Sequence, residues 1–223
     1  MLRNLTQHVC PNGLAAAVLF CGVTVPGQAK EKLMAAHLSV RARNSKAADV
    51  TVYVTGDHMP PKSVDYGARA TVSWIFAKAG VRLDWRDGEL GTYAASGSPV
   101  AIQLRFTGET SGQASPKALA YALPFGDGST AITVMYGRIR IAGRSSREQA
   151  ILAHVLAHEI GHVLQRTNGH AQTGVMRAHW SGRDLEATET RPLEFTSDDV
   201  DLMKQGLIAW KVRNALTSPE VHR

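Results

Sequence analysis

The feature that most constrains this chain is the pentad His158-Glu159-Ile160-Gly161-His162, an H-E-x-x-H pattern inside a long apolar stretch. The stretch runs from Ala150 to Leu164 and is long enough to form a helix. On a helix, side chains four residues apart lie on the same face, about one turn apart. His158 and His162 can therefore bind one tetrahedral Zn²⁺, and Glu159 stands where it can take a proton from a water at the metal.

The third metal ligand must come from outside the pentad, because a catalytic zinc site usually takes three protein ligands. We favour His170, which follows an Asn168-Gly169 break where the helix can end and the chain can turn back. Asn168 itself occupies the third-ligand position of the longer H-E-x-x-H-x-x-G-x-x-H pattern, but an amide is a poor zinc ligand. A downstream carboxylate is the remaining alternative, supplied by Glu186, Glu189 or Glu194.

The first 29 residues have the layout of a secretory signal peptide. A mostly apolar run from Gly13 to Val25 precedes Pro26 and the small residues of a cleavage site that ends at Ala29. We therefore expect a secreted or periplasmic protein in which residues 30–223 form one domain and residues 30–47 form a flexible leader. Both cysteines of the chain precede residue 30, so this domain has no disulfide and no thiolate ligand.

Charge and hydropathy exclude two classes of partner. The chain carries 25 Lys and Arg against 19 Asp and Glu, a formal charge of +6. The basic residues are scattered and not interleaved with aromatic residues, so we expect no nucleic-acid binding. No stretch approaches the ~18 consecutive apolar residues of a membrane-spanning helix, so we expect no stable membrane span. The length suits one hydrophobic core, and we expect a monomer.

Apolar periodicity predicts an α+β domain. The expected strands are residues 50–54, 81–85, 100–106, 118–123 and 131–136, and the expected helices are residues 63–79, about 145–165 and 196–214. We expect a mixed twisted sheet that packs on a backing helix and on the H-E-x-x-H helix, with a C-terminal helix after them. Ser145 or Ser146 is the expected N-cap of the H-E-x-x-H helix. The strand at 131–136 is the expected docking edge for an extended peptide.

The spacing of His158-Glu159-x-x-His162, His170 and Gly174-Val175-Met176 resembles that of metzincin-type zinc peptidases. The run from His158 to Trp180 also resembles small uncharacterised exported bacterial zincin-like proteins. The resemblance implies a zincin-like single domain in which Met176 belongs to a methionine turn and forms an apolar floor under the metal. The chain departs from the family pattern at Gln165, where the longer motif has glycine.

A second departure concerns the group that stabilises the oxyanion of the transition state. Some metzincins use a tyrosine two residues after the methionine, and none stands there in this chain. His179 and the segment 136–138 remain as alternatives. His154, one turn before His158, has no glutamate after it, and we interpret it as a core residue or as one that orients a ligand.

These patterns predict a secreted zinc endopeptidase that acts on peptides or proteins, with Glu159 as general base and zinc held by His158, His162 and His170. Two alternatives stay open. One is a zincin-like module that binds zinc without peptidase activity, and the other is a zinc hydrolase that acts on a different amide or an ester.

Overall fold

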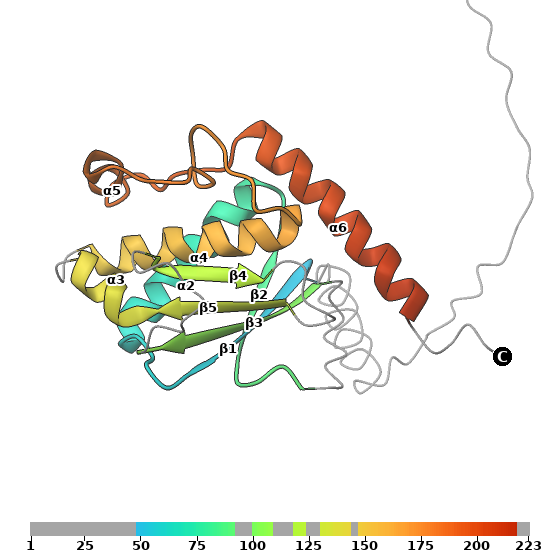
Figure 1. Ribbon diagram of the computed structural model, residues 1–223, viewed down its shortest axis with the longest axis horizontal. Helices are drawn as coiled ribbons and strands as arrows, with labels where there is room; N and C mark the ends of the chain where they lie inside the picture. The colour runs from blue at the N-terminus through green and yellow to red at the C-terminus, as the bar shows by residue number, and fades with distance from the viewer. Residues whose placement is uncertain (1–47, 92–99, 109–117, 124–129, 144–146, 218–223) are drawn as a thin grey trace, which may run out of the picture. The chain divides into compact units, whose positions relative to one another are not determined.

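Five strands form one mixed sheet, in the order β2-β1-β3-β5-β4, in the part of the chain that the structure describes. The structure is a computed structural model, and it describes residues 48–91, 100–108, 118–123, 130–143 and 147–217. The four parallel strands are β1 (Val50–Gly56), β2 (Leu83–Asp87), β3 (Val100–Thr107) and β5 (Thr130–Met135). Strand β4 (Ala120–Leu123) pairs antiparallel with β5 and forms one edge of the sheet (Figure 1).

The burial of the strands follows from their side chains. In β3, Val100, Ile102 and Leu104 are buried while the residues between them are more exposed, as expected where alternate side chains point to opposite faces. In β1, the residues from Val50 to Val54 are all buried. A β-branched run buried on both faces is typical of an interior parallel strand, and β1 lies between β2 and β3.

Helix α2 (Lys62–Lys78) connects β1 to the parallel strand β2, so the predicted strand, helix and strand form a βαβ unit. The helix ends in a Schellman motif, in which the N–H of Val81 donates to the Phe76 carbonyl and the N–H of Gly80 donates to the Ala77 carbonyl. Gly80 has a φ of +77°, a left-handed conformation that glycine adopts without a Cβ clash. Because Val81 belongs to this turn, β2 begins two residues later than the periodicity predicts.

Helix α4 (Glu148–Gln165) carries the H-E-x-x-H pentad and packs between two other helices. Helix α2 lies against it on the same side of the sheet, and α6 (Ser197–Thr217) crosses it near its C-terminal end (Figure 1). Helix α6 begins at a capping box, in which Thr196 and Asp199 exchange hydrogen bonds between their side chains and backbone N–H groups. The predicted α+β class with a mixed sheet is therefore confirmed.

Two short helices were not predicted. Helix α3 (Tyr136–Gly143) follows β5 directly, so Tyr136 begins a helix and is not the last residue of a strand. Helix α5 (Gly182–Ala187) lies in a segment without strong periodicity. It begins at a capping box in which Ser181 and Asp184 exchange hydrogen bonds, and this Ser-x-x-Asp pair was the available sequence signal for it.

Several predictions fall outside the described residues. These are the signal peptide, the leader at 30–47 and the N-cap at Ser145 or Ser146; the described N-cap position of α4 is Arg147. Export therefore remains a prediction. The described residues all belong to one compact unit. None of their helices is both long enough and apolar enough to cross a membrane.

Replacing Gly206 by alanine tests how closely α6 packs on α4. A Cβ at Gly206 would lie 1.7 Å from the carbonyl oxygen of Leu164, so the two helices would have to separate. Helix propensity alone favours alanine over glycine by about 1 kcal/mol. We expect the opposite sign in this protein, with Gly206→Ala lowering the free energy of unfolding in urea by about 1–3 kcal/mol.

The exposed neighbour Gln205 provides the matched control, because Gln205→Ala changes the same helix without entering the contact. We expect this variant to stay within about 0.5 kcal/mol of the parent protein. A Gly206→Ala variant as stable as the parent would contradict the close packing of α6 on α4.

Candidate metal centre

Three histidine side chains converge beside α4. His158 and His162 lie one turn apart on the helix, and His170 comes from the segment after it. Each offers one ring nitrogen, and the three nitrogens lie within 4.8 Å of one another. The ring centroids are 4.5 Å apart for His158 and His162, 4.9 Å for His162 and His170, and 5.3 Å for His158 and His170. Among the described residues, this is the group of such side chains that is compact enough to hold a metal ion.

Backbone carbonyls set the tautomer of two of these rings. The Nδ1 of His158 lies 2.9 Å from the carbonyl oxygen of Val175, and the Nδ1 of His162 lies 2.9 Å from that of Thr167. A carbonyl oxygen only accepts hydrogen bonds, so each Nδ1 carries the proton. Each neutral ring therefore has a bare Nε2, which is the arrangement found where histidine binds a metal and its other nitrogen donates to a second group.

The two bare nitrogens face each other. The Nε2 atoms of His158 and His162 are 3.0 Å apart, so two lone pairs meet with no proton between neutral rings. A cation between them removes this repulsion. Two nitrogen ligands of a tetrahedral Zn²⁺, each about 2.0–2.1 Å from the ion, are separated by about 3.3 Å. The geometry and the donor chemistry of the site therefore fit zinc.

Burial tunes the ionisation of the site. Burial lowers the pKa of His158, and burial together with the neighbouring His158 lowers the pKa of His162 to about 4. Both rings are therefore neutral at neutral pH, as metal binding requires. Glu159 is only 8% exposed. Burial raises its pKa to about 7, against the opposing effect of a backbone hydrogen bond from Ala122.

The turn after α4 brings His170 back to the helix. Gln165, which replaces the glycine of the longer motif, stays helical, and its Nε2 donates to the Asp199 carboxylate at 3.1 Å. The left-handed residue is Arg166, with a φ of 55°, and its N–H donates to the His162 carbonyl. A non-glycine residue in this conformation costs about 1–2 kcal/mol. The reversal therefore occurs one residue later than the glycine position of the motif.

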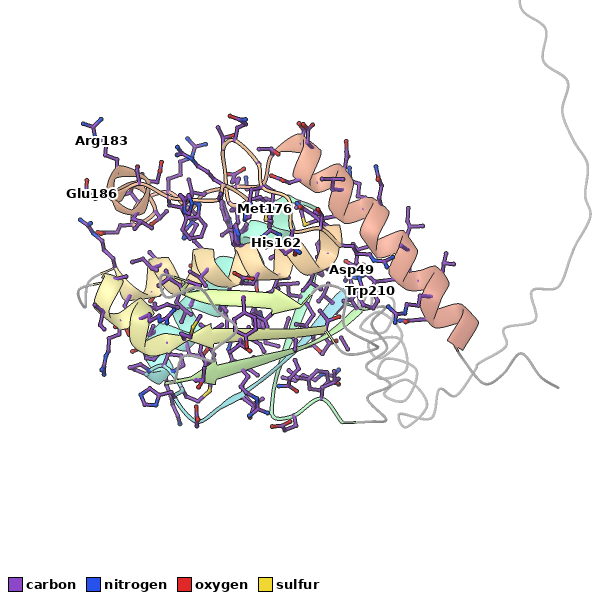
Figure 2. The ribbon with its side chains drawn as sticks, in the orientation of Figure 1. Asp49, His162, Met176, Arg183, Glu186 and Trp210 are labelled. Carbon is purple, nitrogen blue, oxygen red and sulfur yellow. The ribbon has the colours of Figure 1, made fainter. Side chains whose placement is uncertain are left out.

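Met176 packs against Gly161 of the pentad. Its side chain is fully buried, and a Cβ added at Gly161 would lie 2.5 Å from its Sδ. Figure 2 shows Met176 and His162 close together, between α4 and the segment that follows the helix. The glycine of the pentad thus leaves room for the methionine, and an apolar side chain lies beside the helical turn that carries both histidines.

The structure also shows where the alternative third ligands lie. Glu186 and Glu189 both pair with Arg147 at the start of α4, and Figure 2 shows Glu186 on α5, away from His162. Glu194 contributes its backbone carbonyl, which accepts a hydrogen bond from Val175. Asn168 lines the same cavity as the three histidines, but an amide is a poorer zinc ligand than the imidazole of His170.

The structure also distinguishes the two candidates for stabilising an oxyanion. The hydroxyl of Tyr136 is buried and donates to the Glu148 carboxylate, so it faces the interior. The imidazole of His179 is exposed and lines the cavity beside the three histidines. The predicted segment at 136–138 contributes no lining residue, and His179 is the candidate that remains.

A cavity of about 610 Å³ opens over the site. Residues 118–122, in and just before β4, form one wall, and residues 177–180 with Leu185 form another. His158, Glu159 and His162 are exposed to it between these walls. Trp180, whose ring packs edge-on against His158 at 5.7 Å, is not among the predicted site residues. Neither are the backbone groups that orient the histidines, because backbone atoms leave no signature in a sequence.

Comparison with known proteins finds similarity in structure. No protein-family model matches the chain, and a search of curated proteins finds no match. The chain is similar to the crystal structure of archaemetzincin from Methanopyrus kandleri, with 18% identity and a TM-score of 0.43, over 74% of this chain and 98% of that one. It is also similar to a zinc-dependent peptidase from Methanocorpusculum labreanum, with 13% identity and a TM-score of 0.43, over 68% of this chain and 99% of that one.

The contact between Gly161 and Met176 can be tested by a double-mutant cycle. We expect Gly161→Ala to destabilise the protein by about 1–3 kcal/mol, because the new methyl group would overlap Met176. Met176→Ala alone should cost about 2–5 kcal/mol, as for other buried methionines. In the double variant the methyl group has room, so the combined loss should be smaller than the sum by about 0.5–3 kcal/mol. Urea unfolding of the four proteins measures this, and purely additive losses would contradict the contact.

Proposed function

We propose that the protein is a zinc-dependent endopeptidase in which His158, His162 and His170 hold the metal and Glu159 is the general base. The observation that carries this proposal is the pair of bare Nε2 atoms, 3.0 Å apart, with a third imidazole beside them. Neutral rings in this arrangement repel each other unless a cation lies between them. When bound, zinc would acidify a water molecule and polarise the scissile carbonyl.

Glu159 is suited to moving the proton. It is adjacent to His158 in the chain and lines the same cavity, and burial raises its pKa to about 7. A general base works best when its pKa is near the operating pH, because it must accept a proton and then release it. In the proposed reaction Glu159 accepts a proton from the attacking water and passes it to the leaving amine as the C–N bond breaks.

Strand β4 supports the choice of a peptide as substrate. The N–H of Met135 in β5 donates to the Leu119 carbonyl, just before β4. Backbone groups alternate in direction along an antiparallel pair, so those of Ala120 and Ala122 face the outer edge of the sheet, beside the cavity. An extended peptide could add to this edge as a further strand. The strand predicted to take this role, residues 131–136, corresponds to β5, which lies inside the sheet; the edge strand beside the cavity is β4.

Ala122 connects this edge to the proposed base, because its backbone N–H donates to the Glu159 carboxylate. A peptide on the edge of β4 would therefore have its backbone beside Glu159. Together with the predicted signal peptide, this points to exported peptides or proteins as substrates. A zinc-binding module needs no catalytic base. A hydrolase of other amides or esters needs no exposed strand edge beside its base.

Replacing Glu159 by glutamine tests the assignment. The amide keeps the size of the side chain but cannot accept the proton, so we expect peptide hydrolysis to fall by about 10²–10⁴-fold. The metal content should stay at about one zinc per chain, because Glu159 is not among the three convergent histidines. Cleavage of an unstructured peptide library, followed by mass spectrometry, measures the first quantity, and elemental analysis measures the second.

Glu186→Gln is the matched control, since Glu186 is exposed, pairs with Arg147 and lies outside the cavity. It should keep both zinc and activity. Zinc retained in the parent protein with no cleavage of any peptide would favour the binding module, and cleavage confined to small amides or esters would favour the other hydrolase. Full activity in Glu159→Gln would refute the proposed base.

A further inference from the structure

His154 is a buried titratable side chain with no assigned role in the proposed reaction. It lies on α4 one turn before His158, and it is fully buried. Its Nδ1 lies 2.7 Å from the Ala150 carbonyl oxygen, so Nδ1 carries the proton. Its Nε2 is therefore bare, and it accepts a hydrogen bond of 2.9 Å from the N–H of Leu193. Both nitrogens of a neutral ring are thus engaged, and neither is available to a metal.

The partner of His154 belongs to the segment that supports the zinc site. Leu193 is followed by Glu194, whose backbone carbonyl accepts a hydrogen bond of 3.1 Å from the N–H of Val175. The carbonyl of Val175 in turn accepts the Nδ1–H of His158 at 2.9 Å. A continuous path of three hydrogen bonds therefore runs from the side chain of His154 to the ring of His158.

The central hydrogen bond of this path joins two closely packed backbone segments. Gly174 precedes Val175 with a φ of +76°, and a Cβ at Gly174 would lie 2.5 Å from the Glu194 carbonyl oxygen. The two backbone segments therefore touch where they exchange their hydrogen bond. A displacement of Leu193 and Glu194 would move Val175, and with it the carbonyl that orients His158.

Trp180 provides a second connection between the two histidines. Its ring packs edge-on against His154, with centroids 6.1 Å apart, and edge-on against His158, with centroids 5.7 Å apart. The same indole therefore bounds both imidazoles, and it also lines the cavity. A change in the volume or polarity of residue 154 would reach His158 through this contact as well.

We propose that His154 is a positioning residue for His158, which acts through Leu193, Glu194 and Val175 to hold the ligand ring in its metal-binding orientation. The inference rests on the proposed function, since it requires a metal ion at His158. A side chain that only fills the core would affect the stability of the fold and leave the metal site unchanged. Groups that orient a metal-binding histidine typically contribute 10–100-fold to metal affinity.

Two substitutions that differ by one methylene group test the path. In His154→Asn, the shorter amide can still donate to the Ala150 carbonyl but does not reach Leu193. In His154→Gln, the longer side chain can place its carbonyl oxygen where Nε2 stood and accept the Leu193 N–H. The reciprocal variant Leu193→Pro removes the same hydrogen bond from the other end, so the test does not depend on one variant folding.

The readouts are the rate of zinc release to a chromophoric chelator and the visible spectrum of the cobalt-substituted protein. Leu152→Ala is the matched control, because Leu152 is fully buried on α4 and lies outside both the path and the cavity. We expect about tenfold faster zinc release and an altered cobalt spectrum in His154→Asn and Leu193→Pro. His154→Gln should stay within about threefold of the parent rate. Leu152→Ala should lower the melting temperature with neither metal readout changed.

Parent-like zinc release and cobalt spectra in folded His154→Asn or Leu193→Pro would overturn the inference. Equal changes in His154→Asn and Leu152→Ala would overturn it too, because they would indicate general loosening of the core. A parent protein that binds no zinc would refute the proposed function, and this result is distinct from a parent that binds zinc with no effect of residue 154.

Discussion

The burial of α4 is the constraint on which the rest of the described structure depends. Fifteen of its 18 residues are buried, a much larger share than a surface helix shows. The helix packs against α2, α3, α6 and β4, so its apolar residues contact most of the other elements. Close approach on two of its sides is possible because glycines lie at the contacts, Gly206 on α6 and Gly161 on α4 itself. The pentad is thereby held in a rigid element.

The same burial gives the site its electrostatic properties. Removal from water disfavours charge, so it lowers the pKa of His158 and His162 and raises the pKa of Glu159. The imidazoles are neutral and ready for a cation, and the carboxyl can exchange a proton near neutral pH. A single physical cause therefore prepares two of the proposed ligands, His158 and His162, and the proposed base, because all three lie on one buried helix.

Backbone groups complete the site. The carbonyls of Val175 and Thr167 orient His158 and His162, the N–H of Ala122 reaches Glu159, and the N–H of Leu193 reaches His154. These groups come from the edge strand and from the two segments that follow α4. The proposed chemistry depends on residues 166–196 as much as on the pentad, although these residues have little regular secondary structure.

The sequence by itself determined the elements whose periodicity is strong and the residues whose chemistry is specific. The β-branched run of β1, the amphipathic α2 and the spacing of His158, Glu159 and His162 could be interpreted without a structure, because each depends on neighbours along the chain. The convergence of His170 was also expected, from a break in the helix pattern. Only the tertiary structure decided that β4 is the edge strand beside the cavity and that His154 connects to His158. Strand pairing and backbone hydrogen bonds connect residues that are far apart in the chain. Backbone atoms make these contacts, so the contacts leave no side-chain pattern in the sequence.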